Sequence, residues 1–387
     1  MFPKLYRKIA LQRKKYLYDK AFGVLPEESG PDETHLHGAI EWLSRAQDVT
    51  GSGGIAAGYF MLEKRWGLPY RETTGYSIPT FLSYARYMHN ALYRNRAIAM
   101  GDWELGVQCD DGAFGEVFSG GGVVKKVFNT GQVMLGLCAL FDDTRSKCYF
   151  ESVVRAADWL VALQEQDGRW TRFTTAGAKT YHARVAWALL ETWKRSGVVR
   201  YKEAALKQLR WVLSEQNEHG WFRTTSLTDP EKPWTHLLGY TISGLFESSL
   251  LLEAEGEEYY ASVSLALERL AECYATQSFL LPTTFDSLWK SQDKDSCLTG
   301  DAQIGFYWMK SDLFSPHATL NTAGKRMIEE LKKVHLLFQG QPEIAGGVSG
   351  SYPVGGQYCP YTMINWGAKF FADFLLLHIT HDNKIIS

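Results

Sequence analysis

The strongest constraint on the fold is a sequence phrase that recurs six times along the chain. Each copy is an apolar run followed by glutamine and usually by a glycine-containing turn and an aromatic residue, as in AADWLVALQEQDGRW (156–170). The last two copies are degenerate after the glutamine. The repeated glutamines are Gln47, Gln108, Gln164, Gln216, Gln277 and Gln339. Such self-similarity is typical of folds assembled from copies of one supersecondary unit.

A second phrase follows each copy of the first. It places threonine at or beside the start of another apolar run, as in FNTGQVMLGLCALF (128–141), and the threonines are Thr74, Thr130, Thr180, Thr235, Thr299 and Thr362. A threonine hydroxyl can accept a hydrogen bond from an unpaired N–H group in the first helical turn. We therefore expect these threonines to cap the N-termini of helices.

The two phrases predict two kinds of helix in strict alternation. The first kind is amphipathic, as expected for a helix with one solvent-exposed face, whereas the second is apolar nearly all round and rich in Gly and Ala, as expected for a buried helix. Amphipathic helices outside and small-residue helices inside describe a double ring. The sequence thus predicts an all-α fold, an (α/α)6 toroid over residues 34–380, preceded by a basic N-terminal extension at 1–33.

The lengths of the links give the ring a polarity. Links from an inner to an outer helix are short, as in KRSGVVRYK (194–202), whereas links from an outer to an inner helix are long. Long loops in a compact fold are usually functional. In a ring of hairpins they all fall at one end, together with the N-termini of the inner helices, whose partial positive charge favours an anionic ligand.

Composition excludes several classes of function. The net charge of −2 does not suggest a nucleic-acid-binding protein, which usually carries a basic domain. No apolar stretch is long enough to span a bilayer, and the basic start lacks the apolar core of a secretory signal, so we expect a cytoplasmic protein. The basic extension could contact an anionic membrane surface or an assembly partner, but a solvated helix packed outside the ring is the preferred interpretation.

The cysteines give no sign of a metal or cofactor. They are scattered and form no CxxC pair or Cys/His cluster with zinc-ligand spacing. The Gly-rich runs FSGGGVV (118–124) and IAGGVSGSYPVGGQY (344–358) are not phosphate-binding loops, because no strand precedes them and no GKS or GKT follows. We expect free thiols, rim loops, and neither a metal site nor a cofactor.

The predicted working face is rich in polar and aromatic residues. Flat aromatic rings can stack on the apolar faces of sugars while amides and carboxylates bind the hydroxyls. The candidate substrate-binding residues are Arg184, His236, Asn129, Gln132, Tyr76, Trp234, Tyr240, Trp289, Gln303, Tyr361, Asn365 and Trp366.

Three acidic residues are candidates for catalysis. Asp301 lies in the first turn of a predicted inner helix, Glu72 lies just before another, and Asp286 lies in the fifth long loop. Two of them could act as acid and base across a glycosidic bond. The alternative is helix capping, which explains acids at N-termini without catalysis.

A second candidate group combines Tyr181, His182, Arg184 and His236 at the starts of two successive inner helices. A Tyr or His base beside an Arg that binds a carboxylate would suit proton abstraction next to a uronate carboxyl, the chemistry of a lyase or epimerase. The alternative is a buried His and Tyr that bond loop backbone, with Arg in a structural ion pair.

Several phrases resemble known families. The six-hairpin pattern and the Q-x-x-D-G-x-W turn resemble the (α/α)6 carbohydrate-active enzymes, which include unsaturated glucuronyl hydrolases and N-acylglucosamine 2-epimerases. ETTGYSIPT (72–80), TYHARVAWALLE (180–191), CLTGDAQ (297–303) and NWGAKFFAD (365–373) are more closely similar to a poorly characterised family encoded in bacterial exopolysaccharide biosynthesis clusters.

These resemblances imply roles for some of the candidates. The glucuronyl hydrolases place paired Asp residues at the hollow, which Asp301 and Asp286 match by location. The epimerases use two His and an Arg, which His182, His236 and Arg184 match by type. The turn also resembles the QW repeat of squalene-type terpenoid cyclases, although Asp293-Lys294-Asp295-Ser296 lacks the last acid of their D-x-D-D motif.

The leading hypothesis is a glycan-active enzyme, of hydrolase, lyase or epimerase type, that acts by acid–base chemistry on an acidic saccharide in polysaccharide production or turnover. One alternative is a non-catalytic subunit of a polysaccharide assembly system that binds a glycan or lipid carrier. The other is a terpenoid cyclase-like enzyme, which predicts a hollow lined by aromatic side chains with few carboxylates.

Overall fold

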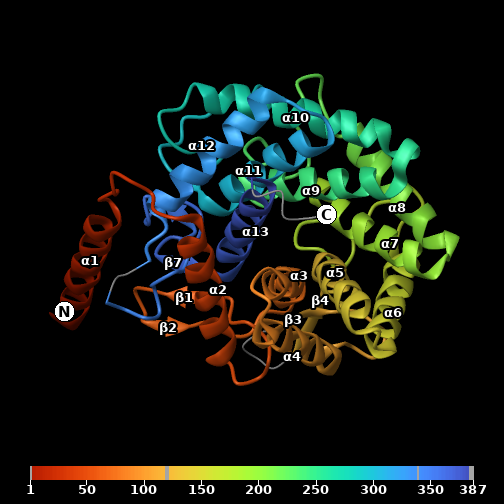
Figure 1. The fold of residues 1–387 in the computed structure, drawn as a ribbon, viewed down its shortest axis with the longest axis horizontal. Coiled ribbons are helices and arrows are strands. Elements are labelled where there is room, and N and C mark those ends of the chain that lie inside the picture. Colours follow the sequence, from red (N-terminus) through yellow and green to blue (C-terminus); the bar gives the residue numbers. More distant parts are fainter. Residues whose placement is uncertain (1, 118–121, 338–339, 383–387) are drawn as a thin grey trace.

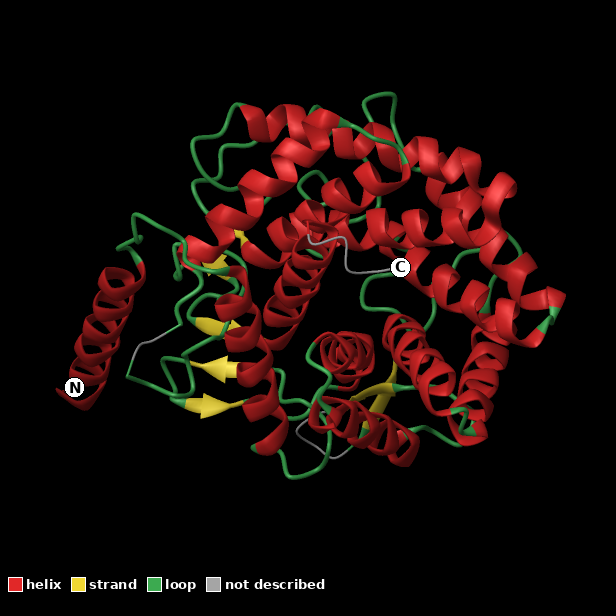
Figure 2. Cartoon of the chain, in the orientation of Figure 1, coloured by secondary structure: helices red, strands yellow, loops and turns green. Residues whose placement is uncertain are grey.

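The computed structural model describes residues 2–117, 122–337 and 340–382, and helices dominate these ranges (Figure 2). Outer and inner helices alternate along the chain as predicted. The outer helices are α2 (Asp32–Asp48), α4 (Ala91–Val107), α6 (Lys147–Leu163), α8 (Val199–Ser214), α10 (Glu257–Ala275) and α12 (Ala318–Val334). The inner helices are α3 (Arg71–Tyr87), α5 (Val127–Thr144), α7 (Ala183–Ser196), α9 (Thr235–Leu252), α11 (Leu298–Phe314) and α13 (Asn365–Asp382). Short 3-10 turns, η1 (Thr180–His182) and η2 (Glu253–Gly256), precede α7 and α10.

The inner helices form a closed ring. Each packs against the next in chain order, and α13 packs against α3, so that the last inner helix meets the first (Figure 1). Small residues allow this close packing: a Cβ atom on Gly136 of α5 would lie 2.0 Å from the carbonyl oxygen of Gly75 on α3. The structure confirms the (α/α)6 toroid.

The repeated glutamine has a structural role. The Gln164 Nε2 group donates to the carbonyl of Gly168 in its own turn (2.8 Å) and to the carbonyl of Ala204 on the next outer helix, α8 (2.9 Å). Gln47, Gln108 and Gln216 make the equivalent pair of bonds. Each of these four glutamines therefore ties one hairpin to its neighbour, which explains the recurrence in the first four copies. Gln339 lies outside the described residues.

Replacing Gln164 with leucine is expected to lower the free energy of unfolding by about 1–3 kcal/mol, because two carbonyl groups lose their donor. Gln277 provides a matched control, since its side chain forms no hydrogen bond within the described part of the chain. Urea denaturation should show a lower midpoint for Gln164→Leu than for Gln277→Leu. Equal midpoints would contradict the structural role.

The repeated threonines do not act as predicted in the first two inner helices. The N-cap residues of α3 and α5 are Tyr70 and Lys126, and neither helix has a side-chain cap. Thr74 instead lies in the first turn of α3 and accepts from the backbone N–H of Ile55, and Thr130 accepts from that of Phe114. The capping prediction was therefore wrong for these two: each threonine fastens a long loop to the inner helix that follows it.

The long loops contain short strands that the sequence did not reveal. β2 (Arg65–Trp66), β1 (Gly58–Phe60) and β7 (Thr362–Ile364) form an antiparallel sheet in that order, with Tyr59 opposite Met363. β3 (Gly115–Val117) pairs with β4 (Val123–Lys125), and β5 (Ser296–Cys297) pairs with β6 (Ser351–Tyr352). The pairing of β1 with β7 joins the first and last long loops and so helps to close the ring at the working face.

The N-terminal helix α1 (Phe2–Phe22) lies outside the ring, beside the sheet (Figure 1). Lys14 and Tyr18 donate to the carbonyls of Leu62 and Met61, and Tyr361 donates to Asp19. In the described ranges, no helix combines the length and the hydropathy needed to cross a membrane.

Candidate active site

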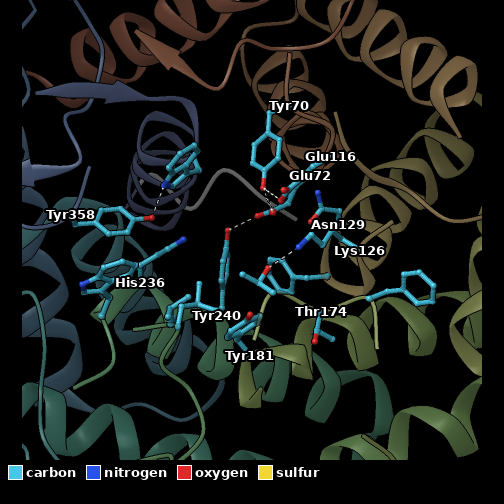
Figure 3. Close-up of a pocket in the computed structure, with 17 residues that line it drawn as sticks. Tyr70, Glu72, Glu116, Lys126, Asn129, Thr174, Tyr181, His236, Tyr240 and Tyr358 are labelled. Carbon is cyan, nitrogen blue, oxygen red and sulfur yellow. Dashed lines mark hydrogen bonds between the residues drawn. The ribbon is translucent and has the colours of Figure 1, made fainter. Parts of the chain in front are cut away.

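A cavity of about 250 Å³ opens at the end of the toroid where the long loops and the inner-helix N-termini meet (Figure 3). Its wall combines aromatic rings with two carboxylates, a lysine and several neutral polar groups. The lining residues are Tyr70, Glu72, Glu116, Lys126, Phe128, Asn129, Phe173, Thr174, Thr175, Tyr181, Leu227, Trp234, His236, Leu237, Tyr240, Tyr358 and Trp366.

One phenol bridges the two carboxylates of the cavity (Figure 3). The Tyr70 hydroxyl oxygen lies 2.8 Å from Glu72 Oε2 and 3.0 Å from Glu116 Oε1. A hydroxyl has one proton and can donate to only one carboxylate at a time. Both contacts are hydrogen bonds only if one carboxyl group is itself protonated and donates to the phenol oxygen. The Tyr70-bridged pair, Glu72 and Glu116, therefore shares one proton.

The environment of Glu72 identifies it as the carboxyl that holds this proton. The pKa of Glu72 is raised to about 7, mainly by burial and also by the nearby charge of Glu116, and these effects outweigh the lowering by the hydrogen bonds from Tyr70 and Tyr240 and by the Arg184 charge. Glu116 is only partly buried, on the β3–β4 hairpin. A carboxyl with a pKa near neutrality can give up and regain a proton under physiological conditions.

Tyr240 links the carboxylate pair to the floor of the cavity. Its hydroxyl lies 3.4 Å from Glu72 Oε1 and 3.2 Å from the hydroxyl of Tyr76. Burial raises the pKa of both tyrosines well above the usual value, so both remain neutral. They are therefore hydrogen-bond donors rather than bases at neutral pH.

Aromatic rings form most of the remaining wall. The Phe128 ring centroid lies 5.0 Å from that of Tyr181 and 4.9 Å from that of Tyr240, and Trp234 meets Tyr358 edge to face at 5.1 Å. The Trp366 indole donates to the Tyr358 hydroxyl at 2.9 Å. This wall offers flat apolar faces with polar edges, which suits a ligand that has both apolar patches and hydroxyl groups.

Two neutral polar side chains that line this cavity each have a nitrogen atom that forms no hydrogen bond within the described part of the chain. The buried Asn129 Nδ2 has no hydrogen-bond partner among the described residues. Burial lowers the pKa of His236 to about 4, so its ring is neutral, and its Nδ1 bonds Gln303 Oε1 at 2.8 Å. Because that oxygen is an acceptor, Nδ1 carries the proton and Nε2 is left as an acceptor.

Lys126 brings a positive charge to the cavity rim. It is the N-cap residue of α5, and its Nζ lies 3.4 Å from Thr175 Oγ1. It forms no salt bridge with any residue in the described ranges. The charge is therefore available to an anionic ligand.

The structure brings seven of the candidate site residues to this cavity. They come from the starts of α3, α5, α7, α9 and α13, which confirms that distant inner-helix N-termini meet at one basin. These residues are Glu72, Asn129, Tyr181, Trp234, His236, Tyr240 and Trp366.

Asp301, Asp286 and His182, which were candidates for catalysis, lie outside the cavity. Asp301 is fully buried and accepts a hydrogen bond from the N–H of Leu281. The Asp286 carboxylate accepts from two backbone N–H groups in its own turn, at 2.9 Å each. His182 is buried without a hydrogen-bond partner, and burial lowers its pKa to about 3. Neither acid lines the cavity, and no hydrogen bond joins the two in the described residues.

The remaining candidates also lie elsewhere. Trp289 donates to the carbonyl of His219, Tyr361 donates to Asp19, and Asn365 donates to the carbonyl of Ala56. Each of these bonds holds a loop or terminal segment in place. Four others, Tyr76, Gln132, Arg184 and Gln303, are buried on inner helices below the cavity.

Sequence reasoning did not select Tyr70 or Lys126 as site residues, and it placed Glu116 in a loop of the working face without giving it a role. Tyr70 precedes an inner helix directly, as Trp234 does, and that position was a usable signal. Glu116 and Lys126 reach the cavity because β3 and β4 form a hairpin beside α5, and no repeat phrase encodes this hairpin. In the described residues, no three His, Cys, Asp or Glu side chains are grouped so as to bind a metal ion.

Comparisons with known proteins support the fold. No protein-family model matches the chain, and no curated protein matches it in sequence. Among solved structures, an unsaturated glucuronyl hydrolase specific for heparin superposes with a TM-score of 0.74 at 11% identity, covering 92% of this chain and 98% of that one. A polysaccharide lyase (TM-score 0.64, 12% identity, 92% and 99% covered) and a family 88 glycosyl hydrolase from Bacteroides vulgatus (0.64, 12%, 90% and 99%) are also similar. The chain therefore has the (α/α)6 toroid fold found in these glycoside hydrolases and polysaccharide lyases.

Proposed function

We propose that this protein is a glycan-active enzyme that performs acid–base chemistry on an acidic saccharide, with Glu72 as the proton donor. The observation that carries the proposal is the Tyr70-bridged pair inside an aromatic-lined cavity. The structural neighbours, which are named as hydrolases and lyases of glycans, support the same class of substrate.

The pair supplies a proton donor and, beside it, a second carboxylate. Protonated Glu72 gives its proton to the oxygen or carbon that gains electrons as the substrate bond breaks. In a hydrolysis, the neighbouring carboxylate of Glu116 stabilises the positive charge that develops on the sugar ring. The Tyr70 hydroxyl lies within hydrogen-bond distance of both carboxylates, so it donates its hydrogen bond to whichever one is ionised.

Substrate binding is assigned to the rest of the cavity. The Trp234, Tyr358 and Trp366 rings stack on a sugar face, and Asn129 and His236 bond its hydroxyls. Lys126 binds the carboxylate of an acidic sugar, because its charge has no partner in the described protein. The likeness of several phrases to a family from exopolysaccharide clusters favours a role in polysaccharide production or turnover.

The reaction type can be identified with oligosaccharides that carry uronic acids both at the non-reducing end and, substituted at the 4-oxygen, inside the chain. A hydrolase would release new reducing ends, and a lyase would create the ultraviolet absorbance of an unsaturated uronate. An epimerase would exchange a sugar C–H proton with deuterated solvent without cleavage. Binding without any of these products would contradict the enzyme assignment and favour a glycan-binding subunit. The two carboxylates of the cavity disfavour the terpenoid cyclase alternative.

The pH dependence of kcat/KM tests the role of the pair, because two substitutions are expected to shift it in opposite directions. A proton donor must be protonated, so activity should fall as pH rises through the pKa of Glu72, which is about 7. Tyr70→Phe removes a hydrogen bond that stabilises ionised Glu72 and should move this limb to higher pH. Glu116→Gln removes a like charge and should move it to lower pH. Shifts of the same sign in both variants would contradict the shared-proton arrangement.

A further inference from the structure

A second cavity lies on the axis of the toroid, below the candidate active site. It has a volume of about 130 Å³. All six inner helices contribute to its wall, through residues that include Tyr76, Leu135, Arg184, Glu247, Gln303 and Lys369. We call it the axial cavity.

A layer of rings separates the two cavities. Tyr76 and Phe370 line the axial cavity, and Tyr240 lines the active site. The Tyr76 and Tyr240 hydroxyls are 3.2 Å apart, and the Phe370 ring centroid lies 5.5 Å from that of Tyr76 and 6.0 Å from that of Tyr240. The side chains of Glu247 and Asp373, which also line the axial cavity, are 14% and 23% exposed. The axial cavity therefore includes two carboxylates that are in partial contact with solvent.

Arg184 places a charge without a counterion in this wall. Arg184 is only 3% exposed to solvent. Its guanidinium donates to two neutral acceptors, Gln132 Oε1 at 2.6 Å and Ser243 Oγ at 2.8 Å, and it lies 5.1 Å from the ring centroid of Tyr240. No carboxylate in the described ranges forms a salt bridge with it. A buried cation is normally compensated by an anion.

The acidic groups of the axial cavity are already paired with other cations. Asp373 binds Lys369 at 2.5 Å, and Glu247 binds Lys310 at 2.5 Å. Asp373 also accepts from Thr80, and Glu247 accepts from Tyr307. The acidic groups of the axial cavity are therefore engaged elsewhere, and Glu72, whose pKa the Arg184 charge lowers, lies in the active site.

Two amide groups beside Arg184 have donors without acceptors. Gln303 Oε1 bonds His236, and Gln132 Oε1 bonds Arg184, so each amide oxygen is occupied. The Nε2 atoms of both glutamines are buried and have no hydrogen-bond partner. The region around Arg184 thus has an excess of positive charge and of unused N–H donors, and it lacks acceptors.

We propose that the axial cavity binds a small oxyanion, such as sulfate or phosphate, between the Arg184 guanidinium and the Gln303 amide. The anion supplies both the missing negative charge and the missing acceptors. This site is separate from the active site and does not depend on the proposed reaction.

Two experiments on the full chain test the proposal. Isothermal titration calorimetry measures sulfate binding, and crystals soaked in selenate show where the anion binds. We expect saturable binding and an anomalous selenium peak within hydrogen-bond distance of Arg184 and Gln303. Arg184→Met should weaken sulfate binding roughly ten- to hundredfold, because a charged hydrogen-bond donor is lost. Arg200→Met, which removes an exposed arginine on α8, should bind sulfate like the wild type.

A second variant separates loss of binding from loss of folding. Gln132→Glu places a carboxylate next to Arg184 and so provides an internal counterion in nearly the same shape. It should abolish sulfate binding while the protein, without added anion, melts at or above the wild-type temperature. Selenate peaks confined to the surface, or unchanged sulfate affinity in both Arg184→Met and Gln132→Glu, would overturn the proposal.

Discussion

Replacing Glu72 with glutamine is expected to lower kcat/KM for an acidic oligosaccharide by about 10²- to 10⁴-fold, the usual contribution of a positioned proton donor. The amide keeps the shape of the carboxyl and can still bond Tyr70, but it cannot transfer a proton. Turnover of purified variant and wild type at pH 6, where wild-type Glu72 is mostly protonated, provides the measurement.

Glu104 offers a matched control for this substitution. It is another fully buried glutamate whose pKa is raised by burial, but it lies on the outer helix α4 and does not line the cavity. Glu104→Gln should retain wild-type kcat/KM. If Glu72→Gln also retained full activity, Glu72 would not be the proton donor.

Replacing Lys126 with methionine is expected to reduce kcat/KM for an acidic substrate roughly ten- to hundredfold, mainly through a higher KM. The reason is that a charged hydrogen bond to the sugar carboxylate contributes about 1.5–3 kcal/mol. In the same variant, kcat/KM for a substrate analogue with a neutral sugar in that position should fall only slightly. Steady-state kinetics on the two substrates therefore separates loss of charge recognition from general damage.

The adjacent residue Lys125 serves as the control, because its substitution removes the same charge from the neighbouring position in the chain. Its ammonium group pairs with Asp111 and does not line the cavity. Lys125→Met should leave both substrates unaffected. Equal losses on acidic and neutral substrates in Lys126→Met would exclude Lys126 as the carboxylate-binding group.

The fold could be predicted because its determinants repeat. The glutamines of the first four hairpins bond the next hairpin, and the small residues of the inner helices permit close packing, so both leave a periodic trace in the sequence. The short strands leave none, because β1 pairs with β7 from the opposite end of the chain. Such pairing depends on ring closure rather than on local propensity.

The site could be predicted only in part, for a related reason. Glu72, Tyr240 and His236 lie at the starts of inner helices, and a ring of helices necessarily gathers such positions. Asp301 occupies a similar position on α11, yet it is buried against the backbone of Leu281. Sequence position fixes the height of a residue along the axis, whereas packing decides whether its side chain faces the cavity or a neighbouring loop.

The most direct test of the shared-proton pair is a titration of the glutamate side chains by NMR, with ¹³C-labelled glutamate in the substrate-free protein. We predict one carboxyl resonance that titrates with a midpoint of about 7 and is missing from the spectrum of Glu72→Gln. If the resonance that disappears in this variant instead titrates near the ordinary glutamate pKa of about 4.3, Glu72 is ionised at neutral pH and the account of the site is wrong.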